Sequence, residues 1–222
     1  MFDWRWDFAF EILPRLLQAT LNTLAAAGIG YGIAVVLGLV FALAQRTPSR
    51  FVTLVVRECV EFIRSTPLVL QIFFVFFVGP QFGIRLSPWV AGMIAIGLHY
   101  SAYLSEVYRG GLEAVPKGQW EACTALNLST TKTYFRVIIP QALPPSLAGM
   151  GNYLVGIFKD TPMLSVIGVA ELMQAANAIG GENYRYLEPY TMVGIIFLAI
   201  SLPAAGLIKV FEAWVRKKLG MN

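Results

Sequence analysis

Five long apolar runs constrain the fold of this chain more than any other feature of its sequence. They lie at about 16–44, 62–78, 88–108, 147–172 and 190–210. A helix needs roughly 20 apolar residues to cross a hydrocarbon layer about 30 Å thick. The composition agrees, because 57% of the 222 residues are hydrophobic and only 14% are charged, whereas soluble domains carry about 25% charge. The sequence therefore predicts an all-α, polytopic membrane protein with about five transmembrane helices and one domain, residues 1–222.

The basic residues predict how these spans are oriented, because cytoplasmic loops are enriched in Lys and Arg. An odd number of spans places the two ends of the chain on opposite faces. If the N-terminus is outside, the inner segments hold twelve of the 17 basic residues: Arg46, Arg50, Arg57, Arg64, Arg109, Lys117, Lys132, Arg136, Lys209, Arg216, Lys217 and Lys218. We therefore expect a cytoplasmic C-terminus and a cytoplasmic segment 109–141. The net charge of +4 reflects this bias and does not indicate nucleic-acid binding.

The segment 109–141 is predicted to form two short helices joined by a turn. Pro116 is a residue that can open a helix, and Asn127 tolerates the left-handed conformation that ends one. Ser129 can cap the next helix, and Pro140 is expected to stop it. Each helix is too short to be stable alone in water, so the pair must dock on something. It can rest on its own spans and the lipid headgroups, or bind a cytoplasmic partner.

Charged residues inside the run 147–172 point to a solute pathway, because intramembrane charges are costly and usually functional. Lys159 and Asp160 lie near its middle, and Thr161-Pro162 directly after them predicts a helix break. Broken helices near the middle of the bilayer bind charged solutes in many transporters. Asn152 lies on nearly the same helix face as Lys159, so the three polar side chains together can meet a zwitterion. The alternative is that Lys159 snorkels and the charged pair caps a short re-entrant segment.

Three more residues are candidates for the same pathway. His99 and Ser101 lie near the centre of the run 88–108, where His99 serves either packing or the path. Gln71 follows Arg64-Ser65-Thr66-Pro67, which repeats the basic-x-Thr-Pro order of the later break and suggests a second interrupted helix. Its neighbours are phenylalanines, which favour lipid or packing contacts.

Glycines in the first run are predicted to pack helices closely. Gly28 and Gly32 have the small-xxx-small spacing that lets helix backbones approach each other in lipid. A phosphate-binding loop is the weaker interpretation, because no Gly-Lys-Ser/Thr follows. The chain is therefore not expected to bind and hydrolyse ATP itself by that loop.

Two alternatives to transport are a membrane-embedded enzyme and a passive channel. An enzyme needs a nucleophile with a base, or metal ligands, within the bilayer. One His and two distant cysteines, Cys59 and Cys123, leave little for either, and no catalytic or metal site is predicted. A passive channel would leave the segment 109–141 without a purpose.

That segment resembles the signature loop of bacterial ABC-transporter permeases, which has Glu-Ala-Ala, a Gly four residues later, and Ile-x-Leu-Pro beyond. Here Glu121-Ala122-Cys123, Asn127 and Val137-Ile138-Ile139-Pro140 stand at the matching spacing. Cys123 replaces the second Ala and Asn127 replaces the Gly, and both changes are physically mild. Residues 62–71, 103–119 and 159–162 are also similar to the polar amino-acid uptake subfamily, so the resemblance covers most of the chain.

The resemblance implies a permease subunit of an ATP-driven importer in the bacterial inner membrane. Its implied partners are cytoplasmic ATPase subunits that bind the ATP, a second permease subunit that is identical or related, a periplasmic solute-binding protein and membrane lipid. The residues implied to dock the ATPase are Gly118, Glu121, Ala122, Cys123, Asn127 and Pro140. Residues 99–101, 151–154 and 184–189 look most like permeases for ectoine-type compatible solutes, and polar amino acids are the wider alternative.

Overall fold

The computed structural model describes residues 3–218, so residues 1, 2 and 219–222 of the predicted domain lie outside it. Within the described residues the regular secondary structure is entirely helical, which confirms the predicted all-α class. In chain order the elements are α1 (Trp6–Ala44), α2 (Arg50–Ser65), α3 (Leu68–Phe73), η1 (Phe74–Val78), η2 (Gly79–Phe82), α4 (Pro88–Glu113), α5 (Lys117–Ala125), α6 (Thr130–Lys132), η3 (Thr133–Ile138), α7 (Ile139–Asp160), η4 (Thr161–Ile167), α8 (Leu172–Asn183) and α9 (Leu187–Lys218). Of these, η1 and η3 are π-helical and η2 and η4 are 3₁₀-helical.

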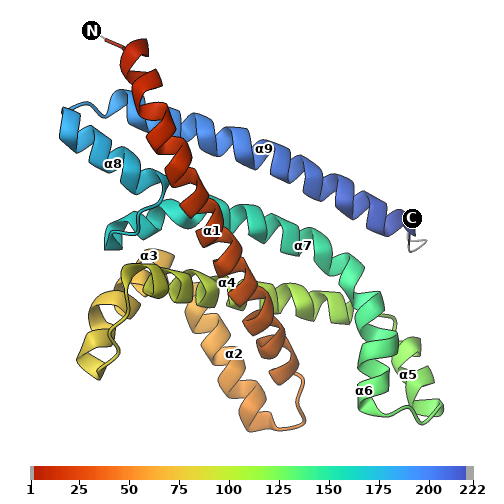
Figure 1. The fold of residues 1–222 in the computed structure, drawn as a ribbon. Helices are drawn as coiled ribbons and strands as arrows, with labels where there is room; N and C mark the ends of the chain where they lie inside the picture. Colours follow the sequence, from red (N-terminus) through yellow and green to blue (C-terminus); the bar gives the residue numbers. More distant parts are fainter. Residues whose placement is uncertain (1–2, 219–222) are drawn as a thin grey trace.

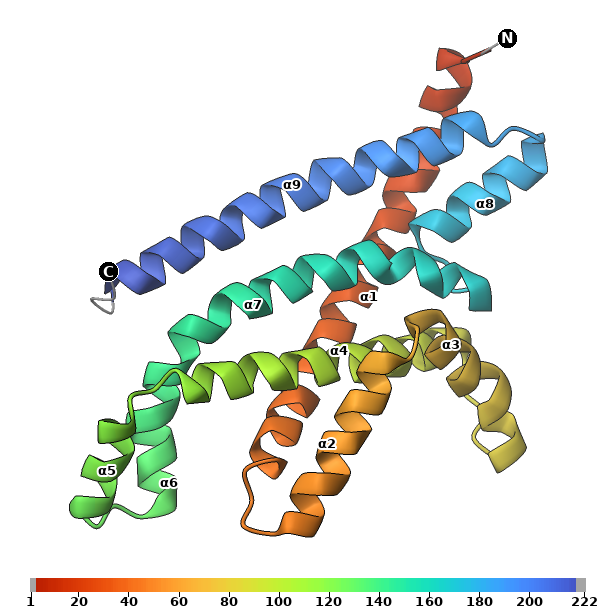
Figure 2. The ribbon, with the colours of Figure 1, turned by 180° about the vertical axis from the view of Figure 1, so that it is seen from behind.

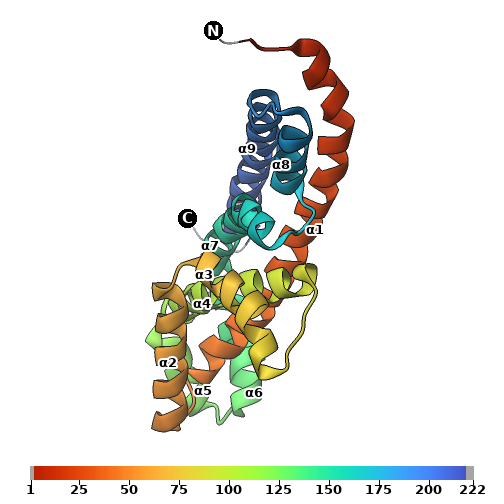
Figure 3. The ribbon, with the colours of Figure 1, turned by 90° about the vertical axis from the view of Figure 1, so that its left-hand side faces the viewer.

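The long helix α1 crosses α9, α7 and α4 in turn (Figures 1 and 2). The N-terminus lies at one end of the molecule, and α2, α5 and α6 project together at the opposite end (Figure 3). Helix α4 forms the centre of the core, where its buried side chains pack against those of α1, α7 and η4. This arrangement brings the turn after α1 to the same end of the molecule as the two short helices of the segment 109–141.

Glycines allow α1 and α4 to cross at close range. A Cβ atom on Gly38 would lie 2.9 Å from both the Leu104 Cβ and the Ser101 carbonyl oxygen, and one on Gly97 would lie 2.7 Å from the Ile33 Cβ. The expectation that Gly28 and Gly32 make such a contact is wrong within this chain, because a Cβ at either position would meet open space. The face of α1 that contacts α4 carries Gly30 and Gly38. Gly28 and Gly32 each lie two positions from Gly30, so they point about 200° away from it, toward the other side of the helix.

Two helices have the length and apolar composition to cross a membrane, Trp6–Ala44 and Leu187–Val215. The number rises to four if each of two bent pairs counts as one span: Arg50–Ser65 with Leu68–Phe82, bent by 107°, and Thr130–Ile167 with Leu172–Asn183, bent by 47°. Helix α4 is 26 residues long but carries His99 and several Ser and Tyr residues, which lower its hydropathy. The total of five spans stays a prediction.

Both Thr-Pro dipeptides interrupt a helix. Helix α2 ends at Ser65, and α3 begins at Leu68 after the extended Thr66 and Pro67, so the suggested second interruption is present. Helix α7 ends at Asp160, where the 3₁₀ segment η4 begins with Thr161 and Pro162 near its start. Thr66 is extended, as the residue before a proline usually is. Thr161 keeps a right-handed helical backbone, and Pro162, which has no N–H to donate, ends only the α-helical hydrogen-bonding pattern there.

The N-terminal end of α1 is tied to the start of α9 and to α8. The Glu188 carboxylate is fully buried, and it accepts hydrogen bonds from the Arg185 guanidinium and, at 3.1 Å, from the Arg5 backbone N–H. Arg15 of α1 forms a two-pronged ion pair with Glu182 of α8, at 2.6 and 2.8 Å. Helix α1 is therefore held at its N-terminal end by charged groups.

Candidate functional site

The two short helices of the segment 109–141 begin and turn where the sequence predicts. Helix α5 starts directly after Pro116, and Asn127 adopts a left-handed φ of 49° just beyond its end. There the Leu128 N–H donates to the Cys123 carbonyl oxygen at 3.1 Å, which closes the helix end. The Ser129 hydroxyl accepts from the Lys132 N–H at 3.4 Å and caps the second helix. We call α5 together with α6 and η3 the coupling pair.

The expectation that Pro140 stops the second helix is wrong. The chain stays helical from Thr130 through η3 into α7, and Pro140 lies in the first turn of α7. A proline normally collides with the carbonyl group four residues earlier, which here belongs to Arg136. That carbonyl lies in the π-helical turn η3, whose wider hydrogen-bonding pattern gives the ring room. The coupling pair is therefore rigidly continuous with α7.

The residues predicted to dock an ATPase lie mostly on the outer face of the coupling pair. Gly118, Glu121 and Ala122 form one exposed face of α5, and Asn127 and Pro140 are also exposed.

Cys123 differs from these residues, because its side chain is buried. Beneath the coupling pair, the buried cluster Leu112, Val115, Ile138 and Ala142 fixes it against the adjoining ends of α4 and α7. Trp120 packs against this cluster. A small exposed face is thus held firmly on two long helices.

A cavity of about 600 Å³ lies between α4 and α7. Its lining brings together the predicted pathway residues His99, Asn152 and Asp160. The Tyr100 hydroxyl donates a hydrogen bond of 2.6 Å to the Asp160 carboxylate. The second carboxylate oxygen of Asp160 has no hydrogen-bond partner among the described residues, so it is available to a cationic group.

Gln71 lies beside this cavity and stabilises the broken helix. Its side-chain oxygen is 3.2 Å from Nδ1 of His99. Its amide nitrogen donates to the Ile63 carbonyl at 2.8 Å and to the Thr66 hydroxyl at 2.7 Å. Since the break leaves helix-end carbonyls without helical partners, Gln71 satisfies groups that the bend exposes and links the bend to the cavity wall.

Tyrosine side chains, which were not among the predicted pathway residues, form much of the cavity wall. The rings of Tyr100, Tyr103 and Tyr153 lie with centroids 5.6 to 6.1 Å apart. The Arg64 guanidinium carbon lies 5.6 Å from the centre of the Tyr103 ring. The available signal was that a tyrosine hydroxyl within an apolar run needs a polar partner.

Besides Gln71, two predicted pathway residues, Ser101 and Lys159, lie outside the lining of this cavity. The Ser101 side chain is buried on the side of α4 that faces Gly38, and its hydroxyl donates to the Leu98 carbonyl at 2.6 Å. Lys159 is exposed. Adjacent helical residues diverge by about 100°, so Lys159 and Asp160 point in different directions from the end of α7, and only Asp160 is among the lining residues.

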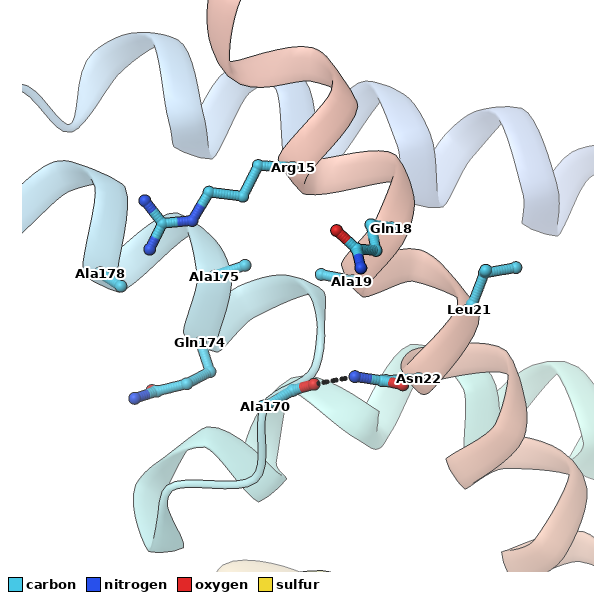
Figure 4. Close-up of a pocket in the computed structure, with 9 residues that line it drawn as sticks. All are labelled: Arg15, Gln18, Ala19, Leu21, Asn22, Ala170, Gln174, Ala175 and Ala178. Carbon is cyan, nitrogen blue, oxygen red and sulfur yellow. Dashed lines mark hydrogen bonds between the residues drawn. The ribbon is translucent and has the colours of Figure 1, made fainter.

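A separate crevice of about 440 Å³ lies between α1 and α8 (Figure 4). Arg15 points from α1 toward α8 across it, and the Asn22 amide donates to the Ala170 carbonyl oxygen at 2.7 Å. The crevice shares no lining residue with the cavity between α4 and α7. It belongs to the packing of α8, whose first turn is capped by the buried Glu171.

Comparisons with known proteins agree on one family. A family model described as binding-protein-dependent transport system inner membrane component matches residues 34–217. A probable amino-acid ABC transporter permease protein of Sinorhizobium fredii is 42% identical over 225 residues, which cover 98% of this chain and 97% of the relative. An L-cystine transport system permease protein of Bacillus subtilis is 35% identical, with 89% and 87% covered.

A solved structure agrees with these sequence relatives. The crystal structure of an amino acid ABC transporter with histidines matches with a TM-score of 0.88 and 31% identity, covering 95% of this chain and 99% of that one.

Proposed function

Because this chain belongs to the inner-membrane components of binding-protein-dependent transport systems, and is a multi-pass permease subunit of an amino-acid ABC importer, we propose that its coupling pair docks the ATPase. The chain is a transport subunit and not an enzyme. In this proposal five spans cross the membrane, the N-terminus is outside, and the end that carries α2, α5 and α6 is cytoplasmic. ATP is bound and hydrolysed by the partner subunits.

One observation carries this proposal most strongly. The face formed by Gly118, Glu121 and Ala122 is exposed, and it sits on a helix pair fixed to α4 and α7. The second helix of the pair runs directly into α7, which ends at the cavity residue Asp160. A displacement of the docking face on α5 is therefore passed by packing to the second helix, which continues directly into α7 and so reaches the cavity.

We propose that the cavity between α4 and α7 receives a polar amino acid or an ectoine-like zwitterion. The free carboxylate oxygen of Asp160 suits an ammonium group, and a charge-assisted hydrogen bond there contributes about 1.5–3 kcal/mol. The Asn152 amide is available to a carboxylate, and the faces of Tyr103 and Tyr153 offer apolar and cation–π contact.

The remaining partners follow from alternating access. A second permease subunit, identical or related, completes the path, and a periplasmic solute-binding protein delivers the solute. In alternating access the cavity opens to one side of the membrane at a time. The loaded binding protein and the closed ATPase each shift the balance between these two states, because each binds one state more tightly than the other.

The test is uptake by proteoliposomes that contain the permease, its copurified ATPase and the solute-binding protein. Labelled L-glutamine, L-cystine and ectoine serve as probes. We expect uptake of at least one of them to require ATP hydrolysis, and uptake that proceeds without ATP would refute the importer.

Within that assay, Asp160→Asn is expected to raise the KM at least about tenfold, since it removes the charge that meets the ammonium group. The matched control is Glu11→Gln, an exposed carboxylate of α1 far along the chain from the cavity. Lys159→Gln is expected to have a small effect because Lys159 lies outside the lining. Unchanged uptake by Asp160→Asn at normal expression would exclude the cavity as the solute site.

A further inference from the structure

Three side chains form a stack that joins the coupling pair to the turn after α1. The Arg46 guanidinium carbon lies 5.1 Å from the centre of the Trp120 ring, within the range of a cation–π contact. The Tyr134 ring meets Trp120 edge-on, with centroids 5.5 Å apart and planes at 78°. Arg46 belongs to the turn after α1, Trp120 to α5 and Tyr134 to η3. We call this group the Arg46–Trp120–Tyr134 stack.

Trp120 faces away from the docking face. Its ring is half-buried and packs on the cluster of Leu112 and Ile138, whereas its neighbour Glu121 is exposed. The tryptophan is therefore a contact within this chain and is not part of the surface offered to an ATPase.

A crevice separates part of the turn after α1 from the coupling pair. It has a volume of about 350 Å³ and lies between Thr47 and Pro48 on one side and Thr131 and Phe135 on the other. Close packing fixes the coupling pair to α4 and α7, and across the crevice the stack connects it to α1. The coupling pair thus has two different attachments.

Arg46 is itself firmly joined to α1. Its backbone N–H donates to the Leu43 carbonyl at 3.0 Å, and the Thr47 hydroxyl donates to the Ala44 carbonyl at 3.0 Å. Helix α1 is one element of 39 residues, and its far end is tied to the start of α9 through Glu188. A displacement at Arg46 is therefore carried along the whole length of the molecule.

We propose that Trp120 is a positioning residue that transmits movement of the docking helix α5 to α1 through Arg46. This inference rests on the proposed function, because the movement originates in the ATPase. It adds a second route to the one through α7: α7 moves the cavity wall, and α1 moves the opposite end of the bundle at the same time.

The experiment measures backbone hydrogen exchange in the permease bound to its copurified ATPase in lipid nanodiscs, with and without vanadate-trapped nucleotide. In the unmodified complex, trapping is expected to change exchange both at residues 43–47 and over residues 139–160. In Trp120→Leu and in Arg46→Gln, the change at 43–47 is expected to fall about two- to fivefold, the factor that corresponds to one exposed cation–π contact. The change over 139–160 should persist.

Two further variants separate transmission from mere folding. Arg46→Lys keeps the cation and is expected to retain most of the response at 43–47, whereas Arg50→Gln changes an exposed arginine outside the stack and should retain all of it. Arg46→Gln leaves the α5 core intact, so it tests the inference even if Trp120→Leu fails to assemble with the ATPase.

The outcomes distinguish failure of the Trp120–Arg46 route from failure of the proposed function. A full response at 43–47 in both Trp120→Leu and Arg46→Gln would overturn the inference and leave the proposed function standing. The absence of any nucleotide-dependent change in the unmodified complex would refute the proposed function and the inference with it.

Discussion

Replacing Gly38 by alanine tests whether α1 and α4 cross as closely as the structure shows. The added Cβ would lie 2.9 Å from the Leu104 Cβ, 2.9 Å from the Ser101 carbonyl oxygen and 3.2 Å from the Ser105 backbone nitrogen. Two of these atoms belong to the backbone of α4, so no flexible side chain can yield. Overpacking of this kind costs about 1–3 kcal/mol.

The matched control is Gly28→Ala, in the same helix, where the new Cβ meets open space. Both variants gain up to about 1 kcal/mol of helix propensity, and this gain cancels in the comparison. Because about 1 kcal/mol shifts the Tm of a chain of this size by about 2–4 °C, Gly38→Ala should unfold at least about 2 °C below Gly28→Ala.

Thermal unfolding in one detergent, followed by tryptophan fluorescence, measures the difference. Equal Tm values for the two variants would refute the reasoning, because they would show that α4 does not lie against Gly38.

Three further predictions concern polar contacts. Gln71→Leu should destabilise the protein by about 1–3 kcal/mol in thermal unfolding, because it leaves carbonyls at the helix break without a donor. The control Gln81→Leu, at an exposed site, should unfold at the same temperature as the unmodified chain. Ser129→Ala removes a helix cap and should destabilise the second helix by about 0.5–2 kcal/mol, which is seen as faster hydrogen exchange at residues 130–138. Unchanged exchange at these residues would show that the Ser129 side chain does not stabilise the helix start. Glu188→Gln should weaken the attachment of the α1 N-terminal end by about 1–3 kcal/mol, which is detected as faster proteolysis near residue 5. Unchanged proteolysis would show that the Glu188 carboxylate is not needed to hold the N-terminal end of α1.

Local signals made the coupling pair predictable. Pro116, Asn127 and Ser129 each act through their own backbone or a neighbour's, so their roles as helix start, stop and cap follow from the sequence and are confirmed. Pro140 was misjudged because its effect depends on the preceding turn, which is π-helical and contributes Ile138 to the packed cluster beneath it.

Tertiary packing determined what the sequence did not reveal. The hydroxyl of Tyr100 and the carboxylate of Asp160 are 60 residues apart and meet only because α4 and α7 pack together. Helix α8 was not predicted, since its small and polar residues carry no strong apolar periodicity and its cap is an acidic side chain, Glu171. The choice between Gly28 and Gly38 likewise depended on which face of α1 meets α4.

Two adjacent residues of α5 offer the most direct test that force enters this chain through the coupling pair. A photo-cross-linking amino acid placed at the exposed Ala122 should capture the ATPase subunit in intact cells, whereas the same group at the buried Cys123 should capture mainly this chain itself. Capture of lipid alone at Ala122, or labelling of that position from the outer face of the membrane while ATP-driven uptake proceeds, would contradict the proposed role of the coupling pair.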